Sequence, residues 1–418
     1  MHLVNQTMLM RRKVVLQILM VLYVLLSYDG VQGEIKLSKV EDLELKKQLK
    51  LLNKPATKII KTKYGDTYDC VDFYKQPAFD HPLLQNHDFH PKMKPTLART
   101  WQNSNTSATI WSSSIWLKER GCPFGTVPIK RVTKDDLIRH KRIPSPEAIS
   151  FEVQFISINN NSESKRSYIS SQGYKLASAQ VQNNPNTRFS GAGMTASLWN
   201  PHVEGQQNSA CRLKIQKGSD ILQVGWRVDP TLYKDNKTRL FVHFQAGNTH
   251  CFNALCPGFV LVNTELPVDM VFDEISHRGD QQMAEITMFI DRDLANGNWW
   301  LLIGENHEQV GFWPHAIFTD LASFATNVEM GGVAYSPPGV PEPPLGAGCS
   351  LAVDPRYDAY CRRPNVLNDK GETIPIVESM NVKLSDSNLY DVLDIPYFRS
   401  GNEHFVLYGG HGEVDTSC

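Results

Sequence analysis

From residue 149 onward the chain repeats one pattern: short runs of alternating apolar and polar residues are separated by turn-forming residues. In residues 285–290 (EITMFI) the side chains of Ile286, Met288 and Ile290 would point to one side of an extended chain. Turn signals such as NGN at 296–298 and PPG at 337–339 separate such runs. Hardly any stretch has a helical period. We therefore expect a mainly β domain, an antiparallel β-sandwich or barrel.

The first 148 residues have a different character. Residues 41–52 carry Leu45, Leu49 and Leu52 at helical spacing, with Pro55 just beyond, which predicts a short helix. Residues 64–129 are rich in loops with short strands, so we expect a small α+β domain over 34–130. Residues 131–148 are charged and then proline-rich. We interpret them as an exposed linker with a proteolytic processing site, or else as a solvated loop that is never cut. The β-rich domain then spans 149–418.

The beginning of the chain resembles a secretory signal. Arg11, Arg12 and Lys13 precede an apolar run at 14–26, and the small residues that follow predict cleavage at the end of residues 1–33. A membrane anchor is the weaker alternative, because a spanning helix needs about 20 apolar residues and Gln17 interrupts this run. We therefore expect a secreted, extracellular protein.

The cysteine count agrees with that compartment. Eight cysteines, an even number, suggest disulfides in a secreted chain. No CxxC pair is present, so a zinc ribbon is not expected and we predict no metal site. Sequons at Asn105, Asn160 and Asn236 are candidate glycosylation sites.

Charge and motifs exclude several function classes. The 43 basic and 44 acidic residues leave a net charge of −1, which argues against nucleic acid as a partner because phosphate binding needs a surplus of Lys and Arg. The chain contains no GxSxG, HExxH, GxxxxGK[ST] or GxGxxG after a strand, so no cofactor is predicted.

Several segments of the sequence closely resemble the plant neprosin family. In the β-rich part these segments are 220–226 (DILQVGW), 230–233 (PTLY), 236–241 (NKTRLF), 251–259 (CFNALCPGF), 297–301 (GNWWL), 311–314 (GFWP), 328–332 (VEMGG) and 408–410 (YGG). The amino-terminal part is similar to that family's activation peptide at 52–56 (LNKPA), 69–72 (DCVD), 74–84 (YKQPAFDHPLL) and 125–129 (GTVPI). The resemblance covers nearly the whole mature chain in order.

The resemblance implies a secreted precursor with a signal peptide, an activation-peptide domain and a β-sandwich of the glutamic-peptidase type. Active members cut after proline at acidic pH with two glutamates. The chemistry needs a pair because one carboxylate activates water while the other donates or shares a proton. The implied partners are a proline-containing peptide or protein and the chain's own activation domain, and the implied location is extracellular or the cell wall.

This sequence departs from the family pattern at both glutamate positions. The first glutamate is expected two residues before the Gly-Trp pair, where Gln223 stands; the second is expected directly after Gly-Gly, where Val333 stands. A glutamine can hold a water and stabilise an oxyanion but cannot take a proton, and a valine can do neither. The first hypothesis is therefore a catalytically impaired prolyl endopeptidase homologue, which could still bind proline-rich extracellular chains without cutting them.

Two other hypotheses stay open. An active enzyme could use a substitute carboxylate, with Glu329, Glu305 or Glu285 as candidates. For Glu329 a structural salt bridge or hydrogen bond is the favoured alternative role. The remaining hypothesis is an alignment displaced by a few residues.

Aromatic residues are candidates for binding a proline ring. We take Trp226, Trp299 and Tyr335 as candidate substrate-binding residues, although core packing is the better expectation for most of the aromatic residues considered. Trp299 and Trp300 must point to opposite faces of a strand, so at most one of them can line a cleft.

The positions of the cysteines suggest three disulfides and leave two residues open. The expected pairs are Cys70–Cys122 in the activation domain, Cys251–Cys256 across a tight loop and Cys349–Cys361 across another, with Cys211 and Cys418 either paired or free.

Overall fold

The computed structural model describes residues 38–96, 121–144, 147, 152–155, 166–169, 173–182, 187–398 and 403–414. The chain divides into two compact units, Met1–Gln48 and Leu49–Cys418. Helix α2 (Lys39–Leu52) begins in the first unit and ends in the second, and it confirms the helix expected over 41–52. The predicted signal peptide, Asn105, Asn160 and Cys418 lie outside the described residues.

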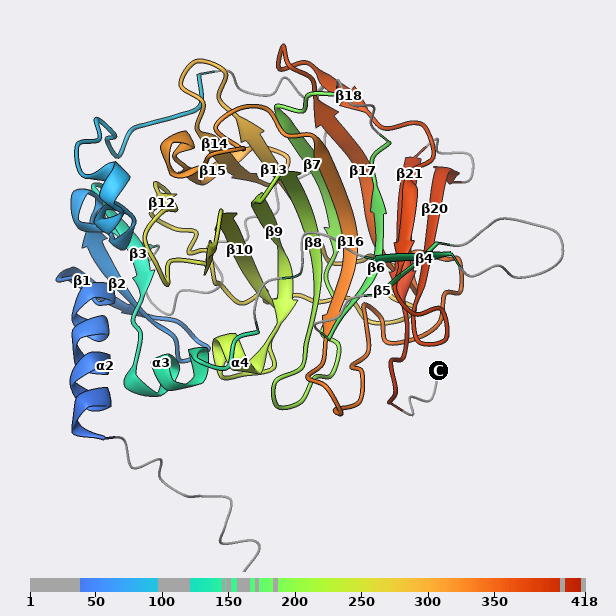
Figure 1. Ribbon diagram of the computed structural model, residues 1–418, viewed down its shortest axis with the longest axis horizontal. Coiled ribbons are helices and arrows are strands. Elements are labelled where there is room, and N and C mark those ends of the chain that lie inside the picture. Colours follow the sequence, from blue (N-terminus) through green and yellow to red (C-terminus); the bar gives the residue numbers. More distant parts are fainter. Residues whose placement is uncertain are drawn as a thin grey trace, which may run out of the picture. The chain divides into compact units, whose positions relative to one another are not determined.

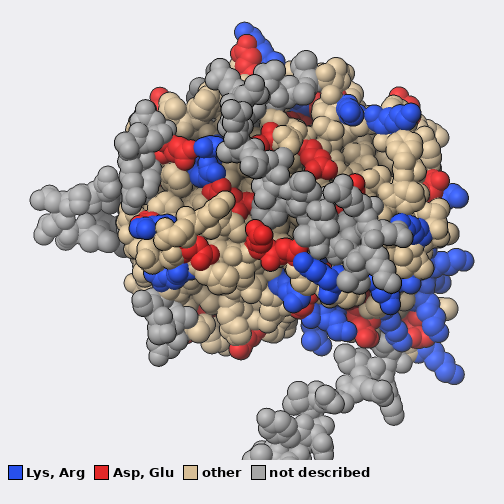
Figure 2. Space-filling model, turned by 180° about the vertical axis from the view of Figure 1, so that it is seen from behind, with Lys and Arg blue, Asp and Glu red and all other residues tan. Residues whose placement is uncertain are grey.

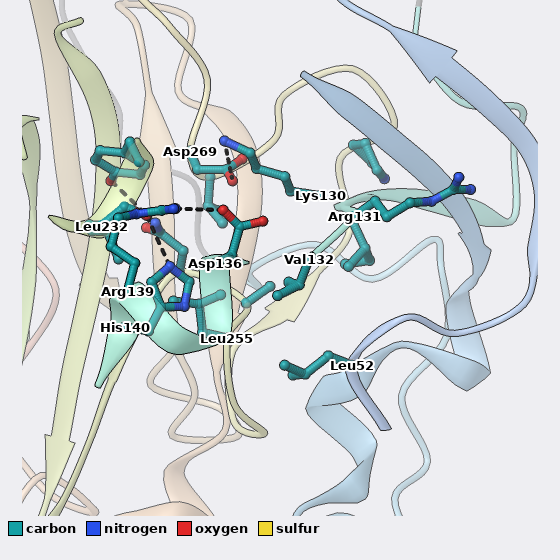
Figure 3. A pocket seen from close by; sticks show the side chains of 16 residues that line it. Leu52, Lys130, Arg131, Val132, Asp136, Arg139, His140, Leu232, Leu255 and Asp269 are labelled. Atoms are coloured by element: carbon teal, nitrogen blue, oxygen red, sulfur yellow. Dashed lines mark hydrogen bonds and ion pairs between the residues drawn. The ribbon is translucent and has the colours of Figure 1, made fainter. Parts of the chain in front are cut away.

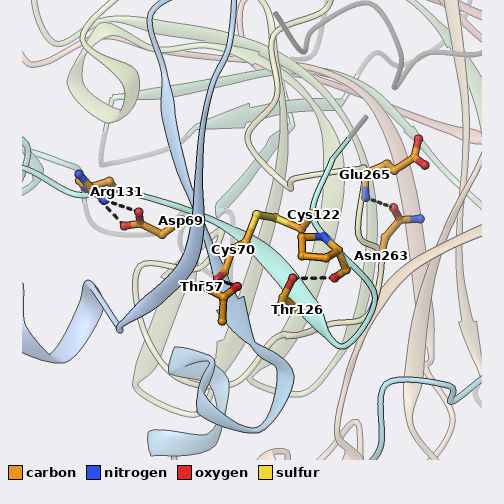
Figure 4. Close-up of a disulfide and its surroundings, with 9 residues drawn as sticks. Thr57, Asp69, Cys70, Cys122, Thr126, Arg131, Asn263 and Glu265 are labelled. Carbon is orange, nitrogen blue, oxygen red and sulfur yellow. Dashed lines mark hydrogen bonds and ion pairs between the residues drawn. A yellow bond between two sulfur atoms is a disulfide. The ribbon is translucent and has the colours of Figure 1, made fainter. Parts of the chain in front are cut away.

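A three-stranded antiparallel sheet forms the core of the activation domain. Its strands are β1 (Ala56–Lys61), β2 (Thr67–Asp72) and β3 (Thr126–Lys130), in the order β1-β2-β3, and three short 3-10 helices follow β2: η2 (Phe73–Lys75), η3 (Pro77–Asp80) and η4 (Pro82–Leu84). The predicted Cys70–Cys122 disulfide is confirmed (Figure 4) and ties β2 to the segment before β3.

Two further sheets make up the β-rich domain and stack as two layers (Figure 1). The first sheet has the order β11-β10-β9-β8-β16-β6-β19-β5-β4. Its strands are β4 (Glu152–Phe155), β5 (Arg166–Ile169), β6 (Tyr174–Gln180), β8 (Asn208–Lys217), β9 (Asp220–Val228), β10 (Arg239–Ala246), β11 (Thr249–Phe252), β16 (Asn327–Tyr335) and β19 (Asn381–Leu384).

The second sheet has the order β12-β15-β14-β13-β7-β17-β21-β20, with β18 paired to β17. Its strands are β7 (Gly191–Ser197), β12 (Val260–Leu261), β13 (Glu285–Arg292), β14 (Trp299–Ile303), β15 (Glu308–Trp313), β17 (Ala359–Leu367), β18 (Thr373–Pro375), β20 (Asp391–Phe398) and β21 (Glu403–Gly409), and the 3-10 helix η5 (His315–Ile317) follows β15. The mainly β, antiparallel sandwich expected from the sequence is confirmed.

The hydrophobic core lies between the two sheets. Leu213, Val224 and Trp226 of the first sheet belong to the same buried cluster as Trp299 of the second. Trp226 and Trp299 are both fully buried, and their indole nitrogens donate hydrogen bonds of 2.8 Å to Ser197 O and 2.7 Å to Leu321 O. The prediction that these two tryptophans bind substrate is therefore wrong: they are core residues whose polar atoms are satisfied by backbone carbonyls.

The segment predicted as an exposed linker contains an ordered helix, α3 (Lys134–His140), whose Leu137 is buried. The prediction that the whole segment is exposed is therefore wrong. Thr133 and Asp136 form a capping box at its start. At its end the Arg139 Nε and the His140 Nε2 lie 3.0 Å from the carbonyl oxygens of Thr231 and Leu232, in the short helix α4 (Pro230–Tyr233) of the β-rich domain (Figure 3). A seven-residue helix is too short to give a sustained apolar period, so the sequence signal is only its cap.

The activation domain makes polar contacts with the β-sandwich. Tyr68 Oη donates a hydrogen bond of 2.8 Å to Asp269, and Arg239 Nη1 lies 2.8 Å from the Asp66 carboxylate. The Gln76 side chain exchanges two hydrogen bonds with the backbone of Leu261. These contacts confirm that the chain's own activation domain is a partner of the β-rich domain.

One predicted disulfide is confirmed in the β-rich domain and one is wrong. Cys251 and Cys256 are bonded. Cys361 is a free, fully buried thiol, so it does not pair with Cys349, which is itself disulfide-bonded. The Cys361 Sγ instead lies 3.5 Å from the Sγ of Cys211, the other free cysteine, because β17 and β8 face each other across the core.

Two further features concern the charged side chains at the surface and the length of the helices. On the face shown in Figure 2, acidic and basic side chains are interspersed. Within the described ranges, no helix has the length and apolar character needed to cross a membrane.

Candidate functional site

The candidate site lies on the outer face of the first sheet, which is turned away from the second sheet. Antiparallel pairing sets His243, Gln223, Lys214 and Glu329 level with one another on β10, β9, β8 and β16. Paired residues project to the same face of a sheet. Gln223 and Glu329 are therefore two strands apart, with about 10 Å between their backbones.

Arg212 connects Gln223 with Glu329. Its Nη1 lies 3.4 Å from Gln223 Oε1, and its Nη2 lies 3.1 Å from Glu329 Oε1. Lys383 Nζ binds the other oxygen of Glu329 at 2.6 Å. Burial would raise the pKa of the fully buried Glu329, but the charges of Lys383, Lys214 and Arg212 outweigh it and hold that pKa well below its usual range. Glu329 is thus an ion-paired carboxylate whose charged form is favoured.

A second carboxylate reaches this face from the linker. Glu147 is 5% exposed, and its Oε1 lies 3.2 Å from Lys214 Nζ. It also forms an ion pair with Arg212. Burial raises the pKa of Glu147, whereas Arg212 and Lys214 lower it by more, so the net shift is downward. The linker therefore carries a charged side chain into the site.

Glu147, Gln223, Val333 and His243 line a small cavity of about 20 Å³. A space of this size holds roughly one water molecule. Both ring nitrogens of His243 lack a hydrogen-bond partner among the described residues. Burial, followed by the charge of His250, lowers the pKa of His243 well below its usual range. Polar and apolar side chains therefore both line the cavity, and a neutral histidine is among them.

Val333 does not lie level with Gln223. It is four residues beyond Glu329 on β16, which is about 13 Å of extended chain, and it packs in a buried cluster with Leu176 and Phe241. Between them Gly331 has φ = +135°, a backbone conformation that disfavours any residue with a Cβ. A Cβ there would lie 2.6 Å from Ser178 Cα. The Gly-Gly pair thus fixes how β16 presents Glu329 and Val333.

The other candidate residues fall in different places. Glu285 lies on the second sheet, where it forms an ion pair of 2.6 Å with Arg362, and Glu305 follows β14 of that sheet, so neither is brought to Gln223. Tyr335 is 8% exposed and belongs to the same outer-face cluster as Val333. Asn236 is exposed in the turn between α4 and β10.

Sequence reasoning missed four residues of the site: Arg212, Lys214, Glu147 and His243. The available signal was strand alternation, because 212 and 214 alternate with the apolar residues 211, 213 and 215 in one run. No local signal marks Glu147, whose burial depends on the docked linker. In the part of the chain that the structure describes, no group of three or more His, Cys, Asp or Glu side chains could hold a metal ion.

The fold and site define a class: an antiparallel β-sandwich whose outer face carries a glutamine and a carboxylate, preceded by a small domain docked on the same sandwich. Two family descriptions match this chain. The neprosin domain matches residues 205–411 and the neprosin activation peptide matches residues 59–180. The chain belongs to the neprosin family.

Solved structures to which this chain is similar include two peptidases. Scytalido-glutamic peptidase with a peptide-based transition-state analogue is 12% identical, with a TM-score of 0.30, over 56% of this chain and 98% of that chain. SCP-B, a member of the eqolisin family of peptidases in a complex with the tripeptide Ala-Ile-His, is also 12% identical, with a TM-score of 0.28 and the same coverage.

Proposed function

We propose that this protein is a secreted neprosin-like protein that keeps the fold of the glutamic peptidases but is catalytically impaired. The observation that carries the proposal is the state of the carboxylates beside Gln223. Glu329 is bound by Arg212 and Lys383, and Glu147 is bound by Arg212 and Lys214. Neither is a free acid or a free base.

The chemistry of peptide hydrolysis explains why this arrangement disables the site. A water-activating base must accept a proton near the working pH, and a partner acid must hold one. The amide of Gln223 takes no proton. The lowered pKa of Glu329 favours its charged form, which makes it a weak base and a poor proton donor. On this proposal the outer face of the first sheet binds proline-containing extracellular chains without cutting them.

A second candidate function is an active prolyl endopeptidase in which Glu329 is the base. The register favours it, because Gln223 and Glu329 stand level on the outer face and Arg212 contacts both. In that case Gln223 would hold the water and stabilise the oxyanion, and substrate binding would have to displace the cations from Glu329.

The experiment that separates the two is cleavage of a proline-containing peptide library at acidic and neutral pH. The purified natural protein is compared with Glu329→Gln and with the double variant Gln223→Glu, Val333→Glu. We expect no cleavage by the natural protein. Cleavage after proline that Glu329→Gln abolishes would overturn the proposal and support the second function. Cleavage by the double variant alone supports an intact cleft that has lost its acid–base pair.

Secretion is part of the proposal and rests on the sequence of residues 1–33. Two disulfides in the described residues and the exposed sequon at Asn236 support it, because both belong to the extracellular chemistry of proteins. Expression in a secretory host with sequencing of the mature amino terminus tests it. A terminus at Glu34 is expected, and retention of an intact terminus in the membrane fraction would contradict it.

A further inference from the structure

Among the described residues, three buried or half-buried cations gather around Glu329 on the outer face of the first sheet. Arg212 and Lys214 are 4% and 2% exposed, and Lys383 lies beside them. Against these three cations the sheet offers Glu329. A buried charge is strongly unfavourable unless it is paired. The sheet therefore needs a further anion at Arg212 and Lys214.

The linker supplies that anion. Glu147 places one carboxylate between Lys214 and Arg212, with 3.2 Å between its Oε1 and Lys214 Nζ. Glu147 does not belong to the sheet, because it lies in the segment between α3 and β4 and not in any of the nine paired strands. Geometrically it occupies the site as the side chain of a bound ligand would.

Unused polar atoms surround the same cavity. The Arg227 Nη2, the Gln245 Oε1 and both ring nitrogens of His243 are buried without a hydrogen-bond partner among the described residues. All three residues line the cavity together with Glu147. Buried polar groups are normally paired, so these atoms offer further hydrogen bonds to a polar occupant of the cavity.

We infer that Arg212 and Lys214, beside this cavity, form a receptor for a carboxylate side chain: Glu147 is its internal occupant, and a glutamate or aspartate of an extracellular polypeptide binds these two cations in its place. The inference rests on the proposed function in taking the cleft as a binding site. It adds the chemical class of the ligand, an acidic segment. A tethered occupant competes at a high effective concentration, so Glu147 opposes the binding of an outside carboxylate.

The test frees the receptor in the full-length secreted protein. Binding of two fluorescent peptides, identical except for one central Glu or Gln, is measured by fluorescence polarisation on the natural protein, Glu147→Gln and Asp135→Asn. Asp135 is the matched control, because it is an exposed carboxylate on α3. We expect Glu147→Gln to bind the Glu peptide roughly tenfold or more tightly than the natural protein does, since it removes one partner of a buried charge pair.

The preference must also depend on the receptor's cations. In the double variant Glu147→Gln, Lys214→Gln the preference for the Glu peptide over the Gln peptide should fall. If Glu147→Gln does not fold, Glu147→Asp keeps the charge on a shorter side chain and should give a smaller gain. The inference is overturned if Glu147→Gln shows no preference between the peptides, or if Asp135→Asn gains as much.

The same peptides also separate this inference from the proposed function. Chromatography of each mixture after incubation shows whether the peptide has been cut. Cleavage by the natural protein overturns the proposed function and leaves the carboxylate preference to be read from binding. Intact peptides that bind without preference overturn the receptor and leave the proposed function standing.

Discussion

The two faces of the first sheet are built from the same strands and are held by different forces. On the inner face Leu213, Val224 and Trp226 belong to one buried apolar cluster with residues of the second sheet and of the activation domain, and no linker residue is part of that cluster. On the outer face Arg212 and Lys214 are neutralised in part by a side chain from the linker. The inner face is thus complete without the linker, whereas the outer face depends on a segment that is not part of the sheet.

The largest expected effect is on the inner face. Trp226→Ala removes the side chain of a fully buried residue and leaves a cavity between the sheets. Truncations of buried Trp or Phe lower the free energy of unfolding by about 3–5 kcal/mol. Chemical denaturation followed by tryptophan fluorescence measures the loss, with Trp226→Phe as the milder control. A loss as small as that of a surface substitution would contradict the core assignment.

A variant on the outer face should lower the free energy of unfolding by a similar amount, because it breaks buried ion pairs. Arg212→Met leaves Glu147 and Glu329 without one of their cations. Breaking a buried pair by removing one partner costs about 3–5 kcal/mol. Removing the charges together, with Glu147→Gln and Glu329→Gln added, should restore much of that stability. If the single variant is no less stable than the triple variant, the carboxylates are not held by Arg212.

The outer face should also make stability depend on acid. Burial keeps folded His243 neutral, because its pKa lies well below the ordinary value near 6.5. Below about pH 6.5 the unfolded chain takes up a proton that the folded chain does not, so stability falls as the pH falls, by at most about 1.4 kcal/mol per pH unit. His243→Phe should remove that part of the slope in melting temperature against pH. An unchanged slope would contradict the buried, neutral state.

Glu342, a carboxylate outside this sheet, should make stability fall as the pH rises, which is the opposite of the effect expected for His243. Burial raises the pKa of Glu342 to about 7, although Lys175 opposes the shift. Its contribution to stability is fully present below the unfolded pKa of about 4.5 and is lost as the pH rises through 7. Glu342→Gln should flatten the decline in melting temperature between these values. A steeper decline in the variant would show that Glu342 is ionised in the folded protein.

The smallest effect is expected at the surface. Asn236 is exposed in a turn, so Asn236→Gln should change the free energy of unfolding by less than about 0.5 kcal/mol. Mass spectrometry of protein from a secretory host should show one fewer glycan in the variant. Equal masses, apart from the substitution itself, would show that this sequon is not used.

The inner face could be predicted from the sequence, and the outer face could not. Alternation in runs such as residues 285–290 follows directly from the two-residue repeat of a strand, so the sandwich was predicted. The same repeat also sends Trp226 to the core, because it lies an odd number of residues from Gln223. The aromatic side chain of Trp226 suggested substrate binding. The face that a strand residue occupies is decided instead by whether an odd or an even number of positions separates it from its neighbours on that strand.

The site depends on long-range pairing, which local sequence does not contain. Gln223 and Glu329 stand level through the registers of β8 with β9 and of β16 with β8. Sequence reasoning assigned Val333 to the family's second glutamate position. Val333 lies four residues beyond Glu329, which is level with Gln223, and it lines the same cavity as Gln223. Glu147 was missed for the same reason, since its partners are 65 or more positions away. The position of the free Cys361 beside Cys211 likewise depends on which strands face each other.

The docked helix α3 has a consequence for how the precursor would mature. Its Arg139 and His140 bind carbonyl oxygens of α4, while Glu147 lies further along the chain. A protease that cuts between His140 and Glu147 would sever the chain, but Arg139 and His140 would still hold the amino-terminal piece on the β-sandwich. Cleavage of the linker and release of the activation domain are therefore separate events. A nicked molecule would migrate as two fragments in denaturing conditions and as one particle in native conditions.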